Sequence, residues 1–195
     1  MLTSSAQFVF QALRHPRKVG AVLPSSNRLG IAMASALNDA ISDARSGESN
    51  AGKPSGVDLG QSCDLQIVEL GPGTGQITRH LPTTNITLVE INHKFSQMLA
   101  STYPDATVFT GSAVEFFRQL KSPCAVVSSI PLLNNPEAGA IRDAVAQAYR
   151  QGLIKQLITY SYGSHSPFAD CGFAVAKQVR FVALNLPPAR VWLYA

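Results

Sequence analysis

A glycine-rich stretch constrains the fold of this chain more than any other feature. It covers residues 68–75 and reads Val-Glu-Leu-Gly-Pro-Gly-Thr-Gly. The apolar run 65–70 predicts a buried strand, and helix-like spacing after the glycines predicts a helix over 75–81. Glycine at every second position lets the backbone approach a ligand closely. Glu90 ends the next apolar run, where a nucleotide-binding α/β unit places a ribose-binding carboxylate.

Two common phosphate-binding motifs do not fit this stretch. The dinucleotide fingerprint G-x-G-x-x-G needs its third glycine where this chain has Gln76. A P-loop needs a Lys-Ser or Lys-Thr pair, and none follows the glycines. Neither motif therefore assigns a ligand to the loop.

Composition indicates one globular domain. The chain has 195 residues, of which 46% are hydrophobic and 14% charged, enough for a full core. No apolar run is long enough to span a bilayer, and the start does not read as a secretory signal. Three scattered cysteines without metal-ligand spacing suit a reducing cytosol, so we expect a cytoplasmic protein. The net charge of +4 favours an anionic surface, either membrane or nucleic acid.

The N-terminal region combines apolar and cationic residues. Residues 3–14 predict a short amphipathic helix, and a basic cluster containing Arg14, Arg17 and Lys18 follows. This pattern suits a helix at the surface of an anionic membrane, and it equally suits a helix that caps the core. Together with a cytoplasmic location, the first alternative predicts a peripheral protein at the inner face of the membrane.

A second helix is expected soon after. Ser25 or Ser26 can cap its N-terminus, and its apolar periodicity continues to about Ser42. Residues 45–62 are rich in Ser, Gly, Asn and Pro and predict a mobile surface loop. We therefore treat 1–44 as N-terminal helices, including a membrane-contacting and lid segment, and 63–195 as the core of a single domain.

From residue 65 the pattern alternates between strand and helix, which predicts a parallel sheet covered on both faces. The last three apolar runs, at 154–162, 174–184 and 190–194, lack a long helix between the final two and predict a closing antiparallel hairpin. Ligands bind beyond the carboxyl ends of such strands. The earlier strands are expected at 65–70, 86–90, 107–110 and 124–129, and the helices at 75–81, 92–102, 112–120 and 136–151.

The glycine loop and Glu90 together resemble motifs I and II of the class I S-adenosylmethionine-dependent methyltransferases, whose fold is Rossmann-like. The resemblance implies a mostly parallel seven-stranded sheet with an antiparallel C-terminal hairpin, and S-adenosylmethionine as cofactor. It also implies that the loop backbone packs against the methionine and ribose parts, and that Glu90 accepts both ribose hydroxyls. The implied cofactor-binding residues are Glu69, Gly71, Pro72, Gly73, Gly75, Glu90, Ile91, Ser112, Ala113, Ser128, Ser25 and Ser26.

Further stretches make the resemblance more specific. They are similar to the small bacterial phospholipid N-methyltransferases, which methylate phosphatidylethanolamine, and to their relatives that methylate ornithine lipids. This resemblance implies an aminolipid substrate, a membrane surface as partner and no nucleic acid. The matching stretches lie at 8–16, 19–26, 68–75, 128–133, 159–162 and 185–189, in the order of the family.

The chain departs from related patterns at two places. Motif III commonly has an acid that contacts adenine, and this chain has Ser112, which accepts a hydrogen bond without charge. The related ribosomal RNA adenine dimethylases carry Asn-Leu/Ile-Pro-Tyr/Phe after the fourth strand. Here the place reads Ser129-Ile130-Pro131-Leu132, so the base-stacking ring, worth about 1–3 kcal/mol in single-strand recognition, is missing.

The implied reaction is in-line attack of a neutral amine on a methylsulfonium, in which the enzyme mainly positions its reactants. We expect Ser129, Pro131 and Tyr160 to form the substrate side of the site. Tyr160, Tyr162 and His165 are candidates to accept the proton of the ammonium headgroup.

Three functions stay open at this stage. The chain is a lipid amine methyltransferase at a membrane surface, an RNA or DNA adenine methyltransferase, or a non-catalytic module that binds the cofactor. The residue at 132 counts against the second, and the intact glycine loop and acids count against the third.

Overall fold

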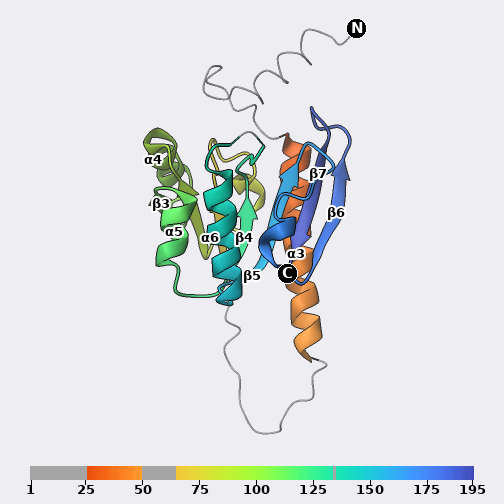
Figure 1. Cartoon of the computed structure of the whole chain (residues 1–195). Coiled ribbons are helices and arrows are strands. Elements are labelled where there is room, and N and C mark those ends of the chain that lie inside the picture. Colours follow the sequence, from red (N-terminus) through yellow and green to blue (C-terminus); the bar gives the residue numbers. More distant parts are fainter. Residues whose placement is uncertain (1–25, 50–64, 134) are drawn as a thin grey trace.

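A seven-stranded sheet forms the centre of the molecule (Figure 1). The computed structural model describes residues 26–49, 65–133 and 135–195. The strand order is β3-β2-β1-β4-β5-β7-β6, and β7 runs antiparallel to the other six strands of the sheet. The predicted fold class is confirmed. The strands are β1 (Gln66–Leu70), β2 (Ile86–Glu90), β3 (Thr107–Thr110), β4 (Cys124–Ser128), β5 (Ile154–Ser161), β6 (Ala176–Val182) and β7 (Ala189–Tyr194).

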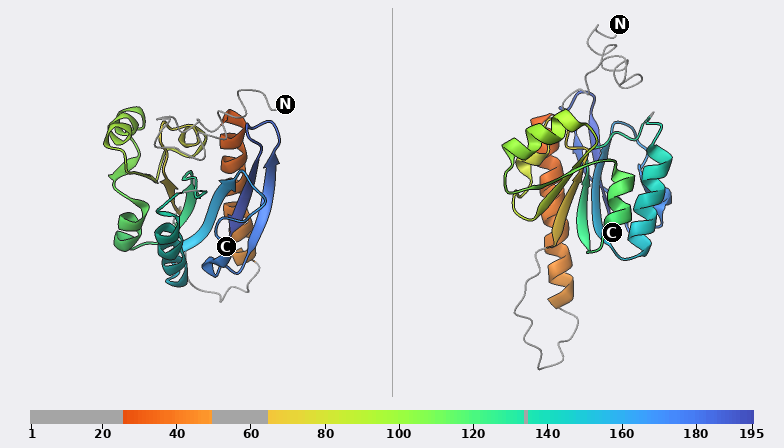
Figure 2. Two further views of the ribbon diagram at one scale, coloured as in Figure 1. Left: turned by 45° about the horizontal axis from the view of Figure 1, so that its top comes forward. Right: turned by 90° about the vertical axis from the view of Figure 1, so that its left-hand side faces the viewer.

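Helices cover both faces of this sheet, giving three layers (Figure 2). On one face lie α3 (Asn27–Ser49) and α4 (His93–Thr102), and on the other α5 (Ala113–Gln119) and α6 (Ala138–Arg150). Every residue of β2 and β4 is buried, as expected for strands covered on both sides. Two hydrophobic clusters result, one under α3 and α4 and one under α5 and α6.

Helix α3 belongs to the core of the domain. Leu29, Met33 and Leu37 recur every four residues and are fully buried against the sheet. The helix begins where it was predicted but runs to Ser49, beyond the expected end near residue 42. No proline interrupts it before residue 54, and Gly47 costs a helix interior only about 1 kcal/mol. The start of the predicted loop 45–62 is therefore helical.

The helix predicted over 75–81 is wrong, because only the short 3-10 helix η1 (Thr78–His80) forms there. Glycines with positive φ place residues 71–75 in turns, and Pro82 holds Leu81 in an extended conformation. Ile77 and Leu81 are nevertheless buried in the core, as their spacing indicated.

The other predicted helices and strands within the described ranges are confirmed to within two residues at each end; the strand predicted at 174–184, for example, begins at Ala176 and ends at Val182. A second 3-10 helix, η2 (Ala169–Cys171), precedes β6. The helix expected at 3–14, the cluster of Arg14, Arg17 and Lys18, and Ser25 lie outside the described residues. In the part that is described, no helix is long and hydrophobic enough to be a membrane span.

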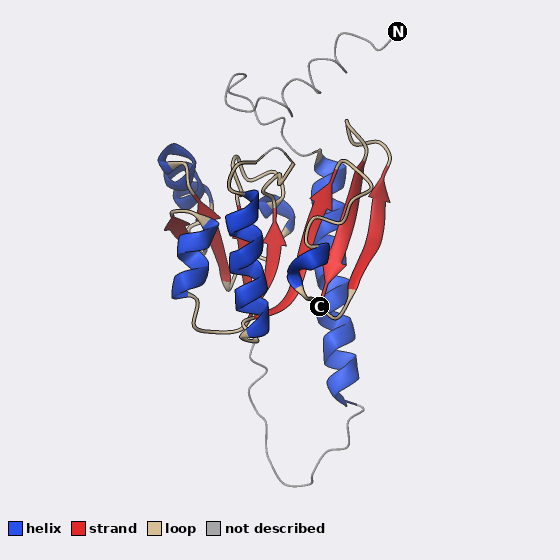
Figure 3. Cartoon of the chain, in the orientation of Figure 1, coloured by secondary structure: helices blue, strands red, loops and turns tan. Residues whose placement is uncertain are grey.

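The carboxyl ends of β1 to β5 and of β6 all point to one edge of the sheet, which we call the carboxyl edge. The loops that follow these strands gather there (Figure 3). The first turn of α3 and the turn between β6 and β7 lie at the same edge (Figure 1). Residues from far-apart segments therefore meet where ligands bind in α/β sheets.

Candidate functional site

The glycine loop after β1 is a tight and constrained turn. Gly71, Gly73 and Gly75 have φ values of 69°, 57° and 77°, a region that other residues rarely adopt. The Gly71 N–H donates to the Val89 carbonyl at 2.8 Å, which ties the loop to the end of β2. A Cβ on Gly71 would lie 2.6 Å from Cγ1 of Ile130. Glycine is thus required there by both the backbone conformation and the loop after β4.

Glu90 connects the glycine loop to the loop after β2. Its Oε2 accepts a hydrogen bond from Gly73 N at 2.9 Å, and its Oε1 accepts one from Asn92 N at 2.8 Å. Asn92 in turn caps the N-terminus of α4 with its side chain. A carboxylate has about four lone-pair directions. Glu90 can therefore hold the loop and still accept two further hydrogen bonds, one on each oxygen.

The space above Gly73 is open. A Cβ there would meet no atom of the described residues within 4 Å, in contrast to Gly71. The side chain of Ile91, directly after Glu90, is 71% exposed. The loop, the carboxylate and this apolar side chain thus offer backbone contact, acceptors for hydroxyl groups and a surface for a flat apolar group.

Glu69 lies at the end of β1, on the sheet face covered by α3. It is fully buried and accepts hydrogen bonds from Thr78 Oγ1 at 2.7 Å and Ser129 Oγ at 2.8 Å. Burial raises its pKa to about 7, the two hydroxyl donors oppose this rise, and the charge of Glu90 adds to it. The carboxyl group therefore titrates near neutral pH.

The hydrogen bond from Ser129 connects the glycine-loop strand to the loop after β4. A serine hydroxyl has one proton and two lone pairs. Because Ser129 donates its proton to Glu69, its oxygen offers only acceptor capacity to any ligand at the carboxyl edge. Ser129 is half-buried, so this capacity is accessible.

The neighbouring residues of this loop point elsewhere. Ser128 is fully buried on the face of Cys124 and Val126, opposite to Glu69, and its hydroxyl has no hydrogen-bond partner among the described residues. Leu132 is buried in the cluster under α5 and α6. The side chain at 132 thus faces the core, and its identity carries no information about a base at this edge. Pro131 is half-buried beside Ser129.

The motif III residues are occupied by helix formation. Ser112 caps α5, accepting from Glu115 N at 3.1 Å, while Glu115 Oε2 accepts from Ser112 N at 2.8 Å. This capping box uses the Ser112 backbone N–H and its hydroxyl proton. Ala113 is buried in the core and presents no side chain to the edge. The structure therefore gives Ser112 a structural role and leaves it a weak acceptor.

The two tyrosines near the end of β5 form a pair. Tyr160 is buried on the α3 face, with its ring 5.3 Å from that of Tyr162 in an edge-to-face arrangement. Burial raises the pKa of Tyr162 well above its ordinary value, and Tyr160 adds to this rise while Asn185 opposes it. Tyr162 therefore stays protonated at neutral pH and is a poor base. His165 is exposed beyond the strand.

Asn185 joins the turn between β6 and β7 to the first turn of α3, a contact that local sequence patterns do not indicate. It is buried in the turn between β6 and β7, and its Oδ1 accepts from the backbone N and hydroxyl of Ser26. Its Nδ2 donates to the Pro187 carbonyl at 2.6 Å. Ser26 also caps α3 by accepting from Leu29 N at 3.2 Å. The hydroxyl of Ser26 is thus occupied by Asn185 and by the N-terminus of α3.

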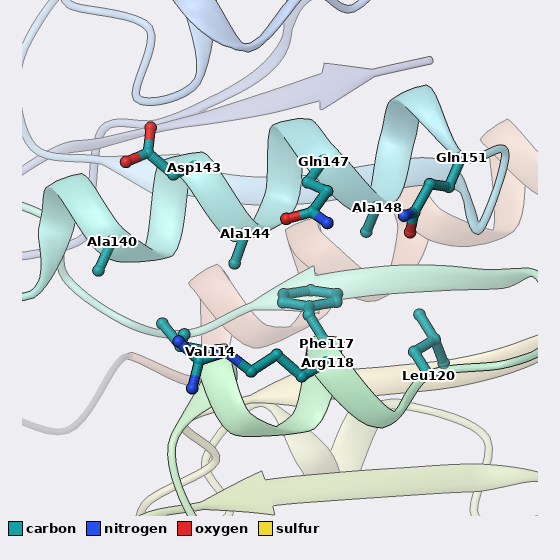
Figure 4. Close-up of a pocket in the computed structure, with 10 residues that line it drawn as sticks. All are labelled: Val114, Phe117, Arg118, Leu120, Ala140, Asp143, Ala144, Gln147, Ala148 and Gln151. Carbon is teal, nitrogen blue, oxygen red and sulfur yellow. The ribbon is translucent and has the colours of Figure 1, made fainter.

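A groove of about 550 Å³ lies away from these residues, between α5 and α6 (Figure 4). Its wall consists of apolar side chains, with the ring of Phe117 between the two helices, and of polar ones such as Arg118 and Asp143. None of the predicted site residues lines it. The groove is therefore separate from the candidate site.

Comparison with known proteins identifies the fold. No protein-family model and no curated protein sequence matches the chain. The bifunctional kinase-methyltransferase WbdD matches with a TM-score of 0.54 and 14% identity, over 85% of this chain and 38% of that chain. The chain has the fold of a class I methyltransferase. It spans about two fifths of WbdD, and at this identity the likeness establishes the fold alone.

Two further solved structures match with lower TM-scores. The 23S ribosomal RNA methyltransferase ErmE matches with a TM-score of 0.47 and 21% identity, over 78% of this chain and 66% of that chain. Fibrillarin of Aeropyrum pernix, crystallised with natively bound S-adenosyl-L-methionine, matches with a TM-score of 0.48 and 14% identity, over 67% of this chain and 66% of that chain.

Proposed function

We propose that the chain is an S-adenosylmethionine-dependent N-methyltransferase that acts on the amine of a membrane aminolipid, with phosphatidylethanolamine as the first candidate. The observation that best supports S-adenosylmethionine as the cofactor is the geometry of Glu90. This buried carboxylate is fixed by Gly73 N and Asn92 N, keeps free lone pairs, and stands beside the open space over Gly73.

The residues at the carboxyl edge fit the chemistry of this cofactor. Glu90 would accept the two ribose hydroxyls, Gly73 would let the backbone approach, and Ile91 would cover one side of the adenine. Glu69 would lie on the side of the cationic part, and a cation there favours the ionised carboxylate. When bound, S-adenosylmethionine supplies a methyl group on a sulfonium.

Ser129 is the best placed residue for the amine of the substrate. Its hydroxyl proton is directed to Glu69, so its oxygen accepts an N–H from the incoming amine and orients the nitrogen lone pair. Tyr160 and Tyr162 would line the same side as neutral rings. Glu69 has a pKa of about 7 and accepts the Ser129 hydroxyl proton, so its carboxylate is suited to take up a proton through Ser129.

The assignment of an aminolipid as the substrate rests on the resemblance of the sequence to phospholipid N-methyltransferases. Stretches that carry that resemblance contribute Ser26, Ser129 and Asn185, which directly precede α3, directly follow β4, and lie in the turn between β6 and β7, all at the carboxyl edge. Adenine methylation in RNA remains the second candidate. Leu132 is buried, so the leucine at this position no longer counts against a substrate base at the carboxyl edge.

Calorimetric titration with S-adenosylmethionine tests the cofactor site. Glu90→Gln should weaken binding roughly tenfold to a hundredfold, because hydrogen bonds to a charged group contribute about 1.5–3 kcal/mol each. Glu137→Gln is the matched control, since this exposed carboxylate makes no capping hydrogen bond and lies off the glycine loop. Equal affinities for both variants would overturn the assignment.

A further inference from the structure

Large apolar side chains are exposed at the tip of the turn between β6 and β7. Leu184 is 74% exposed and Leu186 is 66% exposed, while Val182 and Ala189 at the ends of the flanking strands are buried. Leu133, in the loop after β4, is 65% exposed at the same edge. Exposed leucines at such values are unfavourable in water unless something covers them. We call Leu184 and Leu186 the leucine tip.

The leucine tip is held by the residue between its two members. Asn185 points inward, is buried, and hydrogen-bonds Ser26 and the Pro187 carbonyl. Its anchoring leaves the flanking leucines to project from the protein at the carboxyl edge. The turn is therefore attached to the first turn of α3 and does not depend on the leucines for its shape.

The charged side chains in the segment that contains the tip are all positive. Residues 171–195 contain Lys177, Arg180 and Arg190 and no acidic residue. Arg180 is paired with Asp39 of α3, whereas Arg190 has no carboxylate partner in the described part of the chain. The Arg190 guanidinium lies 5.2 Å from the ring centre of Phe181, which is 54% exposed. Arg190 donates to the Gly163 carbonyl at 3.4 Å, which leaves its charge without a counter-ion among the described residues. Leucines next to an aromatic ring and such a cation match the boundary between lipid headgroups and acyl chains.

We propose that the leucine tip inserts into the interface of an anionic lipid bilayer and brings the carboxyl edge to the membrane. This deepens the proposed function and rests on it for the identity of the substrate. Ser26 is hydrogen-bonded to Asn185, so the described part of the chain begins beside the tip.

A bilayer fits the tip better than RNA does. Single-stranded RNA is bound by side chains on which bases stack, and leucine has no such face. The ring of Phe181 is already covered on one side by Arg190. Two projecting aliphatic side chains instead contribute by leaving water for the acyl region.

Vesicle co-sedimentation of the full chain tests the proposal. Vesicles of phosphatidylglycerol with phosphatidylethanolamine are compared with neutral phosphatidylcholine vesicles. The double variant Leu184→Ser with Leu186→Ser should bind the anionic vesicles at least roughly tenfold more weakly than the unchanged chain. Val175→Ser is the matched control, because Val175 is an exposed apolar residue at the opposite end of the hairpin. Equal binding by both variants, or sedimentation with RNA and not with vesicles, would overturn the proposal.

A fluorescence measurement keeps the proposal testable if the double variant misfolds. Leu184→Trp should shift its emission to the blue on anionic vesicles, and Val175→Trp should not. The native Trp192 is present in both variants and cancels in the comparison. An unchanged spectrum for Leu184→Trp would refute insertion.

Activity distinguishes failure of the tip from failure of the proposed function. If the inference is right, the double variant keeps its methyl transfer to short-chain phosphatidylethanolamine dispersed as monomers and loses it on vesicles. If the wild-type chain binds vesicles through the tip but methylates no aminolipid, the proposed function is refuted and the membrane contact of the tip is still supported. Equal loss on both forms of lipid would overturn the tip as a membrane contact.

Discussion

Replacing Glu69 by Gln should remove a pH dependence of stability that this one carboxyl group causes. Glu69 is fully buried, has hydroxyl donors and no ion pair in the described structure, and its pKa is raised from 4.5 to about 7. Gln has nearly the same shape, and the hydroxyls of Thr78 and Ser129 can rotate to match its amide. The variant therefore keeps the packing and loses the titration.

The sign follows from proton binding. Between pH 4.5 and about 7 the folded chain holds a proton on Glu69 that the unfolded chain has lost. The contribution to the free energy of unfolding is thus fully present below pH 4.5 and is lost as the pH rises through about 7. A shift of this size corresponds to roughly 3 kcal/mol, of which about 2 to 3 kcal/mol falls between pH 5 and pH 8.

Urea denaturation of both proteins at pH 5 and pH 8 measures this effect. Other titrating groups are common to both and cancel in the difference. The free energy of unfolding of Glu69→Gln relative to wild type should rise by roughly 2 to 3 kcal/mol between the two pH values. A difference that does not change with pH, or one that falls, would refute the reasoning about this buried carboxyl group.

Three further predictions follow from the same contacts. Gly71→Ala should destabilise the chain by roughly 2 kcal/mol or more, because its Cβ would meet Ile130, whereas Gly73→Ala should cost only about 1 kcal/mol of backbone strain and yet weaken cofactor binding; equal unfolding energies would contradict this. Thr78→Val should move the pH midpoint of the Glu69 effect above about 7, as seen in urea titrations across pH, since one donor is lost; an unmoved midpoint would argue against that donor. Asn185→Ala should lower the free energy of unfolding by roughly 1–3 kcal/mol in urea, and an unchanged value would mean that its two partners are satisfied elsewhere.

The parts of the fold that depend on neighbouring residues were predictable from the sequence. Alternating apolar runs and breakers located the strands, and Ser112 three residues before Glu115 is a readable signal for the start of α5. The helix expected after the glycine loop failed, because glycine conformation and a following proline override apolar spacing. Local pattern and local geometry thus conflict at this loop, which is also where the candidate site lies.

The contacts that build the site were less predictable. Ser26 and Asn185 are 159 residues apart, and only the packing of α3 beside the turn between β6 and β7 brings them together. The bond from Ser129 to Glu69 spans 60 residues and depends on the register of β4 with β1. The direction of side chains was also not predictable from the sequence. Ser128 and Leu132 flank the predicted substrate loop, and both point into the core.

The most direct test of the central claim is methyl transfer from labelled S-adenosylmethionine to lipid vesicles, with the lipid products separated afterwards. One set contains phosphatidylethanolamine, one an ornithine lipid and one neither, all on an anionic background. The account predicts labelled mono-, di- or trimethylated aminolipid with wild type and strongly reduced label with Glu90→Gln. Cofactor binding without any labelled lipid, together with label in adenine of added RNA, would contradict it.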